Sequence, residues 1–180
     1  MNMSVSARDV AAALRERLPG LPTKKLHKLL YYCQGHHLAA TGEALFTETI
    51  SAWDMGPVVG TLWHEERSGD ARPSTQLSES QLNTVGYVVS RYGRLTGRDL
   101  EVLTHSESPW QRANERRLPQ TSSRIELSWI REHFRVAATP DEDEEQLDSA
   151  EVMTWLEGAQ ARRGDDLRPD SRAEIAARLR

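Results

Sequence analysis

The sequence predicts a mainly α fold: a compact multi-helix domain with at most a short extended or strand segment around residues 46–53, and a C-terminal helical tail. Two observations support this prediction. Apolar residues recur at helical spacing in most segments of the chain. In addition, a Ser, Thr or Asp N-cap precedes an acidic or amide residue by three positions at six places, which is the pattern of a capping box. These lie at Ser6/Asp9, Ser78/Gln81, Thr96/Asp99, Ser108/Gln111, Asp148/Glu151 and Ser171/Glu174.

Hydrophobic staples accompany four of these six helix starts. In each staple, an apolar residue just before the cap is followed five positions later by a second apolar residue. Contact between the two fixes the angle at which the chain enters the helix. The pairs are Val5 with Val10, Leu77 with Leu82, Leu95 with Leu100, and Leu147 with Val152.

The first two helices are defined by their apolar faces and by the residues that stop them. The first helix ends at Pro19-Gly20, and its apolar face consists of Val10, Ala13, Leu14 and Leu18. The second helix ends near Gly42, and its apolar stripe consists of Leu26, Leu29, Leu30, Cys33, His37 and Ala40. We therefore expect an amphipathic second helix with one buried side.

The next segment changes its pattern. Between Ala44 and Asp54, a few apolar residues among threonines and a serine favour a short strand or extended segment. Pro57 then predicts the start of a helix, because its missing amide costs nothing at the first helical position. The residues that follow Pro57 at helical spacing are Val58, Val59, Leu62 and Trp63.

Apolar spacing predicts further helices around Val85, Leu103 and Ile130, and the composition changes soon after the last of them. Residues 141–145 form a run of five acids, which repel one another and favour an extended chain. We therefore expect three parts: a helical domain over residues 1–138, an acidic linker over 139–148 and an amphipathic helical tail over 149–180.

The composition excludes several classes of protein. The 180 residues carry a formal net charge of −4, so the chain is not a strongly basic polyanion binder. Its single cysteine, Cys33, rules out an internal disulfide and fits a reducing compartment. Residues 1–9 lack the features of a secretory signal, and no apolar run approaches the roughly 18 to 20 residues of a membrane span. The expected location is the cytoplasm.

No pattern in the sequence nominates a catalytic centre. There is no nucleophile elbow, phosphate-cradling glycine loop or dinucleotide fingerprint. His36-His37 and His64-Glu65-Glu66 lack the ligand spacing of a zinc site. Cys33 lies on an apolar stripe, where a buried hydrophobic role is favoured over a nucleophilic one. We therefore expect a non-enzymatic protein with no catalytic residue, metal or cofactor.

Several blocks follow one another in a consistent order: Lys25-Leu26-His27-Lys28-Leu29-Leu30-Tyr31-Tyr32-Cys33-Gln34-Gly35, Trp53, Gly56-Pro57-Val58-Val59, Tyr92-Gly93, Leu103-Thr104-His105 and Pro109-Trp110. Together they resemble the Panacea, or SocA-like, antitoxin domain over residues 22–134. The resemblance implies a helical antitoxin of a bacterial or phage (prophage) toxin–antitoxin system, which binds and neutralises a cognate protein toxin encoded beside it. At least one family member delivers its toxin to a cytosolic protease, so the resemblance also implies a proteolytic adaptor as a variant of this role.

The resemblance implies that the shared motif residues are mainly structural: Leu29, Tyr31, Gln34, Gly35, Trp53, Gly56, Pro57, Val58, Pro109 and Trp110. The residues that we expect to bind the partner are Lys24, Lys25, Lys28, Tyr32, His36, Met55, Trp155 and Leu156. The three lysines form either a solvated helix face or a site for an anion or acidic partner, because helix N-termini attract anions. Trp155 either anchors the partner, as large aromatics do in interfaces, or packs against the main body.

A DNA-binding autoregulator of its own operon is the alternative function. The first two helices are joined by a short turn, and the basic residues placed to line one side are Arg15, Arg17, Lys24, Lys25 and Lys28. Against this, the net charge is acidic and the second helix has no run of residues suited to reading base edges. Nucleic acid is therefore the less favoured partner.

Overall fold

The computed structural model describes residues 5–69 and 74–138. These residues form a mainly α fold, as the sequence predicts, with a small three-stranded antiparallel sheet that goes beyond the single short strand expected around residues 46–53. The elements in chain order are α1 (Ala7–Arg17), α2 (Thr23–Thr41), β1 (Ile50–Trp53), β2 (Gly56–Val59), α3 (Gly60–Ser68), α4 (Glu79–Tyr92), α5 (Gly97–His105), α6 (Ser108–Glu115), β3 (Ser123–Arg124) and α7 (Leu127–Ala138). None of the described helices has the length and apolarity that a membrane span requires.

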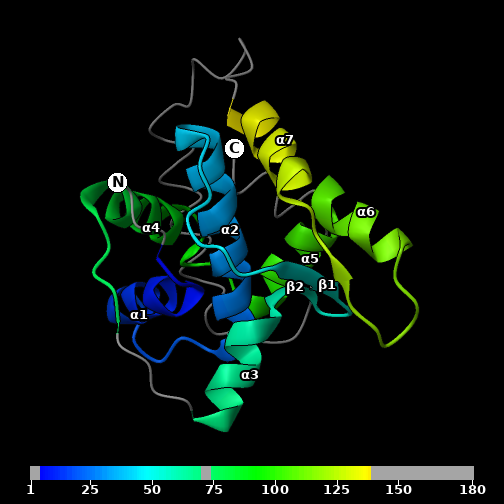
Figure 1. Cartoon of the computed structure of the whole chain (residues 1–180), viewed down its shortest axis with the longest axis horizontal. Helices are drawn as coiled ribbons and strands as arrows, with labels where there is room; N and C mark the ends of the chain where they lie inside the picture. Colours follow the sequence, from blue (N-terminus) through cyan, green and yellow to red (C-terminus); the bar gives the residue numbers. More distant parts are fainter. Residues whose placement is uncertain (1–4, 70–73, 139–180) are drawn as a thin grey trace.

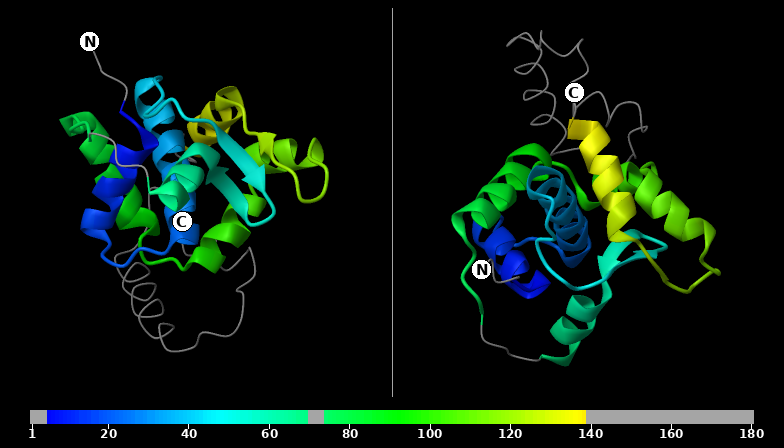
Figure 2. Two further views of the ribbon diagram at one scale, coloured as in Figure 1. Left: turned by 60° about the horizontal axis from the view of Figure 1, so that its bottom comes forward. Right: turned by 45° about the horizontal axis from the view of Figure 1, so that its top comes forward.

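Helix α2 is the centre of the domain. Figures 1 and 2 show it enclosed by the other elements, and it contacts α1, α4, α5, α7 and β2. Residues 26–35 of α2 are all buried, whichever side of the helix they occupy. The prediction of one apolar stripe is therefore too narrow, because neighbours on every side bury polar residues of this helix as well.

The helix caps confirm three of the predicted helix starts and the predicted end of α2. Capping boxes form at Ser6, Ser78 and Thr96, and Gly42 ends α2 in the left-handed conformation. The capping box predicted at Ser108 is wrong, because Ser108 is already helical and the N-cap is Glu107. The side chain that would complete that box, Gln111, instead donates to the carbonyl of His105. The boxes predicted at Asp148 and Ser171 lie outside the described residues.

The small sheet shows that Pro57 lies in a strand and not at the start of the predicted helix. Strands β1 and β2 form a hairpin, and β3 pairs with the other edge of β1, giving the order β2-β1-β3. The expected strand before Asp54 is confirmed, but the helix predicted from Pro57 begins only at Gly60. Pro57 lies opposite Ala52 in the edge strand β2, where a missing amide is tolerated.

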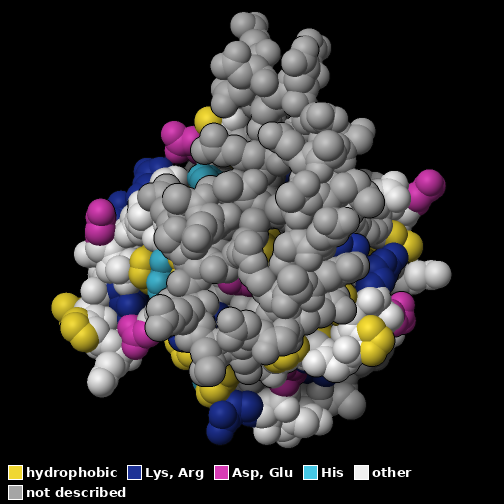
Figure 3. Space-filling model, turned by 180° about the vertical axis from the view of Figure 1, so that it is seen from behind, with side chains coloured by type: hydrophobic (Ala, Val, Ile, Leu, Met, Phe, Trp, Pro, Cys, Tyr) yellow, Lys and Arg dark blue, Asp and Glu magenta, His cyan; other side chains and the backbone are white. Residues whose placement is uncertain are grey.

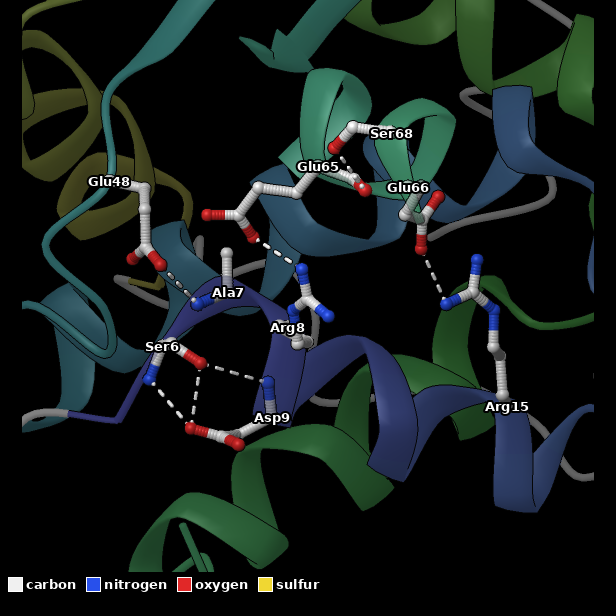
Figure 4. A network of polar contacts seen from close by, with 9 residues as sticks. All are labelled: Ser6, Ala7, Arg8, Asp9, Arg15, Glu48, Glu65, Glu66 and Ser68. Atoms are coloured by element: carbon white, nitrogen blue, oxygen red, sulfur yellow. Dashed lines mark hydrogen bonds and ion pairs between the residues drawn. The ribbon is translucent and has the colours of Figure 1, made fainter. Parts of the chain in front are cut away.

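A polar network fastens α3 to α1 (Figure 4). Arg8 bonds Glu65 at 2.9 Å, and Arg15 bonds Glu66 at 2.7 Å. Glu48, in the segment before β1, accepts the backbone N–H of Ala7 at 3.0 Å. These contacts position α3, whose Trp63 forms part of the pocket described below.

Gly35 allows α2 and α7 to lie close together. A Cβ atom at this buried position would overlap the ring of Phe134. We expect Gly35→Ala to lower the free energy of unfolding by about 1–3 kcal/mol, because overpacking forces neighbouring groups to shift. Urea unfolding measures this loss.

Gly86→Ala is the matched control for that substitution. Gly86 also lies within a helix, but a Cβ there would meet no atom within 4 Å. This variant should gain up to about 1 kcal/mol from helix propensity. Equal effects of the two substitutions would contradict close packing at Gly35.

Candidate functional site

A pocket of about 770 Å³ lies beside the N-terminal end of α2. We call it the α2 pocket. It is lined by the start of α2, the β1–β2 hairpin, α3 and the loop before β3. Its lining residues are Thr23, Lys24, His27, Lys28, Trp53, Asp54, Met55, Val58, Trp63, Gln120, Thr121 and Ser122. The pocket thus brings together Lys24, Lys28 and Met55 from the residues expected to bind a partner, and Trp53 and Val58 from the family motif.

His27 occupies the wall of the pocket with one ring nitrogen engaged. It is only 2% exposed. Its Nδ1 accepts the backbone N–H of Val59 at 3.2 Å, while its Nε2 is buried and has no hydrogen-bond partner in the described part of the chain. Burial, and next the charge of Lys28, lowers the pKa of His27 to about 4. At neutral pH the ring is therefore neutral, and the hydrogen bond from Val59 assigns the proton to Nε2.

Lys28 is buried, so the prediction of a solvated face is wrong for this lysine. Its side chain is 1% exposed, and its Nζ donates to the carbonyl of Pro57 at 3.4 Å. Burial lowers the pKa of Lys28 to about 8, and the opposing effect of Glu101 is smaller. An ammonium group in this position is costly for the fold.

Gly56 makes room for the Lys28 side chain. Its φ is +107°, a conformation that other residues rarely adopt. A Cβ at Gly56 would also lie 2.8 Å from Cε of Lys28. The glycine of the hairpin therefore serves both the turn and the burial of the lysine.

The other two lysines of the cluster are engaged within the domain. Lys24 forms an ion pair with Glu101, and Lys25 donates to the carbonyl of Gly93 at 2.6 Å. The basic side predicted for α1 and α2 is thus largely occupied by intramolecular contacts. On the face seen in Figure 3, basic, acidic and apolar side chains are interspersed over the described surface. These observations give no support to the DNA-binding alternative.

The wall formed by the β1–β2 hairpin and α3 is largely aromatic and apolar. Trp53 and Trp63 meet edge to face, with ring centroids 5.4 Å apart. Met55, at the tip of the β1–β2 hairpin, is 53% exposed and forms part of the rim. Asp54 is held by Arg117 at 2.5 Å, so its negative charge is partly compensated. The pocket therefore combines an apolar wall from the β1–β2 hairpin and α3 with polar residues from α2, including His27 and Lys28, and from the loop before β3, residues 120–122.

Tyr32 and His36 lie elsewhere, in the interior between α2, α4 and α7. Tyr32 is 1% exposed and stacks on Tyr92 with the ring centroids 4.0 Å apart. The Nε2 of His36 lies 2.8 Å from the hydroxyl of Tyr92. The structure does not place these two residues at the α2 pocket, and their contact with a partner stays a prediction. Trp155 and Leu156 lie outside the described residues.

Glu107 is the important residue that the sequence reading missed. It is 8% exposed, and its two carboxylate oxygens accept the hydroxyls of Tyr31 at 2.8 Å and Tyr32 at 2.7 Å. The adjacent tyrosines of the family motif are thereby tied to the start of α6. A weak signal was available, since two tyrosines on a buried helix require hydrogen-bond acceptors.

The family-motif residues lie mostly in the interior and make contacts within the domain. All of them are buried except Trp53, which is half-buried. Gln34 donates to the carbonyl of Phe46 and accepts the N–H of Leu45, which fixes the loop before β1. The indole N–H of Trp110 donates to the carbonyl of Trp53 at 3.2 Å and joins α6 to β1.

Cys33 is fully buried, which raises the pKa of its thiol far above the ordinary range and keeps it protonated. Across residues 5–69 and 74–138, no three His, Cys, Asp or Glu side chains gather in a metal-binding arrangement.

Comparison with known families identifies the central part of the chain. Residues 26–111 match the family model described as antitoxin SocA-like, Panacea domain. The matched segment runs from α2 into α6 and includes most of the residues of the α2 pocket. No solved structure gives a significant match to the chain.

Proposed function

Because residues 26–111 match the family model of the SocA-like Panacea antitoxins, we propose that this protein binds a cognate protein toxin and neutralises it by direct contact. The family match is the observation that carries this proposal. The burial of the motif residues supports a division of labour. The motif builds the domain, and more exposed residues, such as Met55 on the pocket rim, contact the toxin.

Co-expression tests the proposal. The reading frame next to this gene should arrest growth when expressed alone, and growth should recover when this protein is produced with it. A neighbour that is harmless alone, or that remains toxic beside this protein, would argue against an antitoxin.

A variant with Met55→Asp, which places a charge on the exposed rim, should rescue growth less well than Leu118→Asp, which changes another exposed apolar residue outside the pocket.

The C-terminal tail is proposed as a second contact with the toxin. Removing residues 140–180 should weaken toxin binding roughly tenfold or more if Trp155 anchors the interface, because such residues carry a large share of interface energy. Trp155→Ala in the full chain should reproduce most of the loss. Titration calorimetry measures the toxin affinity of the truncated chain and of the Trp155→Ala variant. An unchanged affinity of the truncated chain would contradict a role of the tail in toxin binding.

A proteolytic-adaptor role is the finer form of the same proposal. An adaptor shortens the half-life of the toxin, whereas simple occlusion leaves the toxin present and inactive. Following toxin levels after translation is blocked, with and without this protein, separates the two mechanisms. Stable toxin in the rescued cells would exclude the adaptor.

A further inference from the structure

His27 and Lys28, in the lining of the α2 pocket, have donors that the fold does not use. Nε2 of His27 has no hydrogen-bond partner among the described residues, although buried polar atoms nearly always have one. Within the same residues, the ammonium of Lys28 makes one hydrogen bond, which at 3.4 Å is long. Two donors from consecutive residues of α2, one of them charged, are therefore only partly satisfied among the residues that line the pocket.

The first turn of α2 adds to the polar lining of the pocket. The N-cap is Pro22, which offers no side-chain cap, and the first turn contains no acidic residue. The turn nevertheless lies at the positive end of a 19-residue helix. Thr23 and Lys24, which begin the helix, both line the pocket. An anion placed here would meet a favourable field as well as the two side-chain donors.

The other lining residues indicate what kind of molecule could fill the rest of the pocket. Trp53, Trp63 and Met55 present flat or flexible apolar surfaces. The volume of about 770 Å³ falls within the range of roughly 300 to 1,000 Å³ that is typical of small-molecule sites. A flat apolar body is the shape that such walls accommodate.

We propose that the α2 pocket binds a small aromatic carboxylate, whose carboxylate oxygens accept hydrogen bonds from Nζ of Lys28 and Nε2 of His27 while its ring lies against Trp53, Trp63 and Met55. A purely apolar ligand would leave the His27 donor unsatisfied. A cation would face Lys28 without a free carboxylate, since Asp54 is paired with Arg117. This inference does not depend on the proposed toxin partner.

Calorimetry and NMR with a defined probe test the site. Indole-3-acetate is titrated into the full-length protein at neutral pH, and the neutral isostere indole-3-acetamide serves as the comparison. We expect saturable binding of the acid, and roughly tenfold or weaker binding of the amide, because the amide lacks the charge that pairs with the buried lysine. Shifts in the NMR spectrum should be largest for His27 and the Trp53 indole.

Two variants decide whether Lys28 recognises the carboxylate. Lys28→Met should fold and should reduce binding of indole-3-acetate roughly tenfold or more, to the level of the amide. Arg135→Met, which removes an exposed cation from α7 outside the pocket, should bind as the unchanged protein does. The proposal is overturned if acid and amide bind alike, if Lys28→Met binds the acid normally, or if the acid does not bind. None of these results would affect the antitoxin proposal, which is tested by growth rescue.

Discussion

Replacing Glu107 with alanine is expected to lower the free energy of unfolding by about 3–5 kcal/mol, the largest loss that we predict for a single side chain. The carboxylate accepts the hydroxyls of Tyr31 and Tyr32, and both tyrosines are at most 1% exposed. Without it, two buried hydroxyls lose their acceptor at the centre of the domain. Urea unfolding followed by circular dichroism measures the effect.

Two further variants isolate this cause. Glu107→Gln retains one carbonyl acceptor and should lose much less stability than Glu107→Ala. Glu115→Ala removes an exposed acid from the same helix, α6, and should change the free energy of unfolding little. If Glu107→Ala lowered the free energy of unfolding as little as Glu115→Ala does, the hydrogen bonds from Tyr31 and Tyr32 to Glu107 would not be a major support of the fold.

Replacing Lys28 with methionine is expected to stabilise the protein by about 3 kcal/mol at pH 7. Folding lowers the pKa of this lysine from 10.5 to about 8, chiefly through burial, and each such tenfold change in proton affinity corresponds to about 1.4 kcal/mol. Methionine has a similar length and carries no charge that must be buried. A buried lysine whose removal stabilises the fold is a residue retained for another reason, such as binding.

The stability gained by Lys28→Met should change with pH in a defined direction. Between pH 8 and 10.5 the unfolded chain binds a proton at Lys28 that the folded chain has released. Stability conferred by this position therefore rises with pH. The advantage of Lys28→Met should be complete below pH 8 and should disappear as the pH approaches 10.5.

The free energies of unfolding of Lys28→Met and of the unchanged protein are measured at several pH values between 7 and 10. Their difference isolates Lys28, because the other titrating groups contribute equally to both proteins. Lys24→Met, which changes a half-buried lysine paired with Glu101, should show a much smaller effect. A variant that is less stable than the unchanged protein at every pH would contradict the cost assigned to burying Lys28.

The elements that were predicted correctly have local causes. The caps at Ser6, Ser78 and Thr96 depend on residues three positions apart, so the sequence contains all that their formation requires. Pro57 was misread because a proline suits both a first helical turn and an edge strand. Only the pairing of β2 with β1 decides between them, and that pairing depends on the tertiary fold.

The candidate site was predictable only in part. Lys24, Lys28 and Met55 were expected to bind a partner and do share a pocket, but the burial of Lys28 was not foreseen. A lysine between apolar positions normally reaches solvent, and here α5 and β2 cover it. No pattern in the sequence marks His27 as buried, and the two tyrosines predict a buried acceptor without indicating that Glu107 is that residue.

Direct measurement of the complex tests the central claim, that this protein neutralises a toxin by binding it. The purified full-length protein is titrated into the purified toxin encoded beside it, while complex formation and toxin activity are followed in the same samples. The account predicts a saturable complex, with toxin activity falling in proportion to the fraction bound. Full toxin activity at saturating amounts of this protein, or loss of activity without any complex, would contradict it.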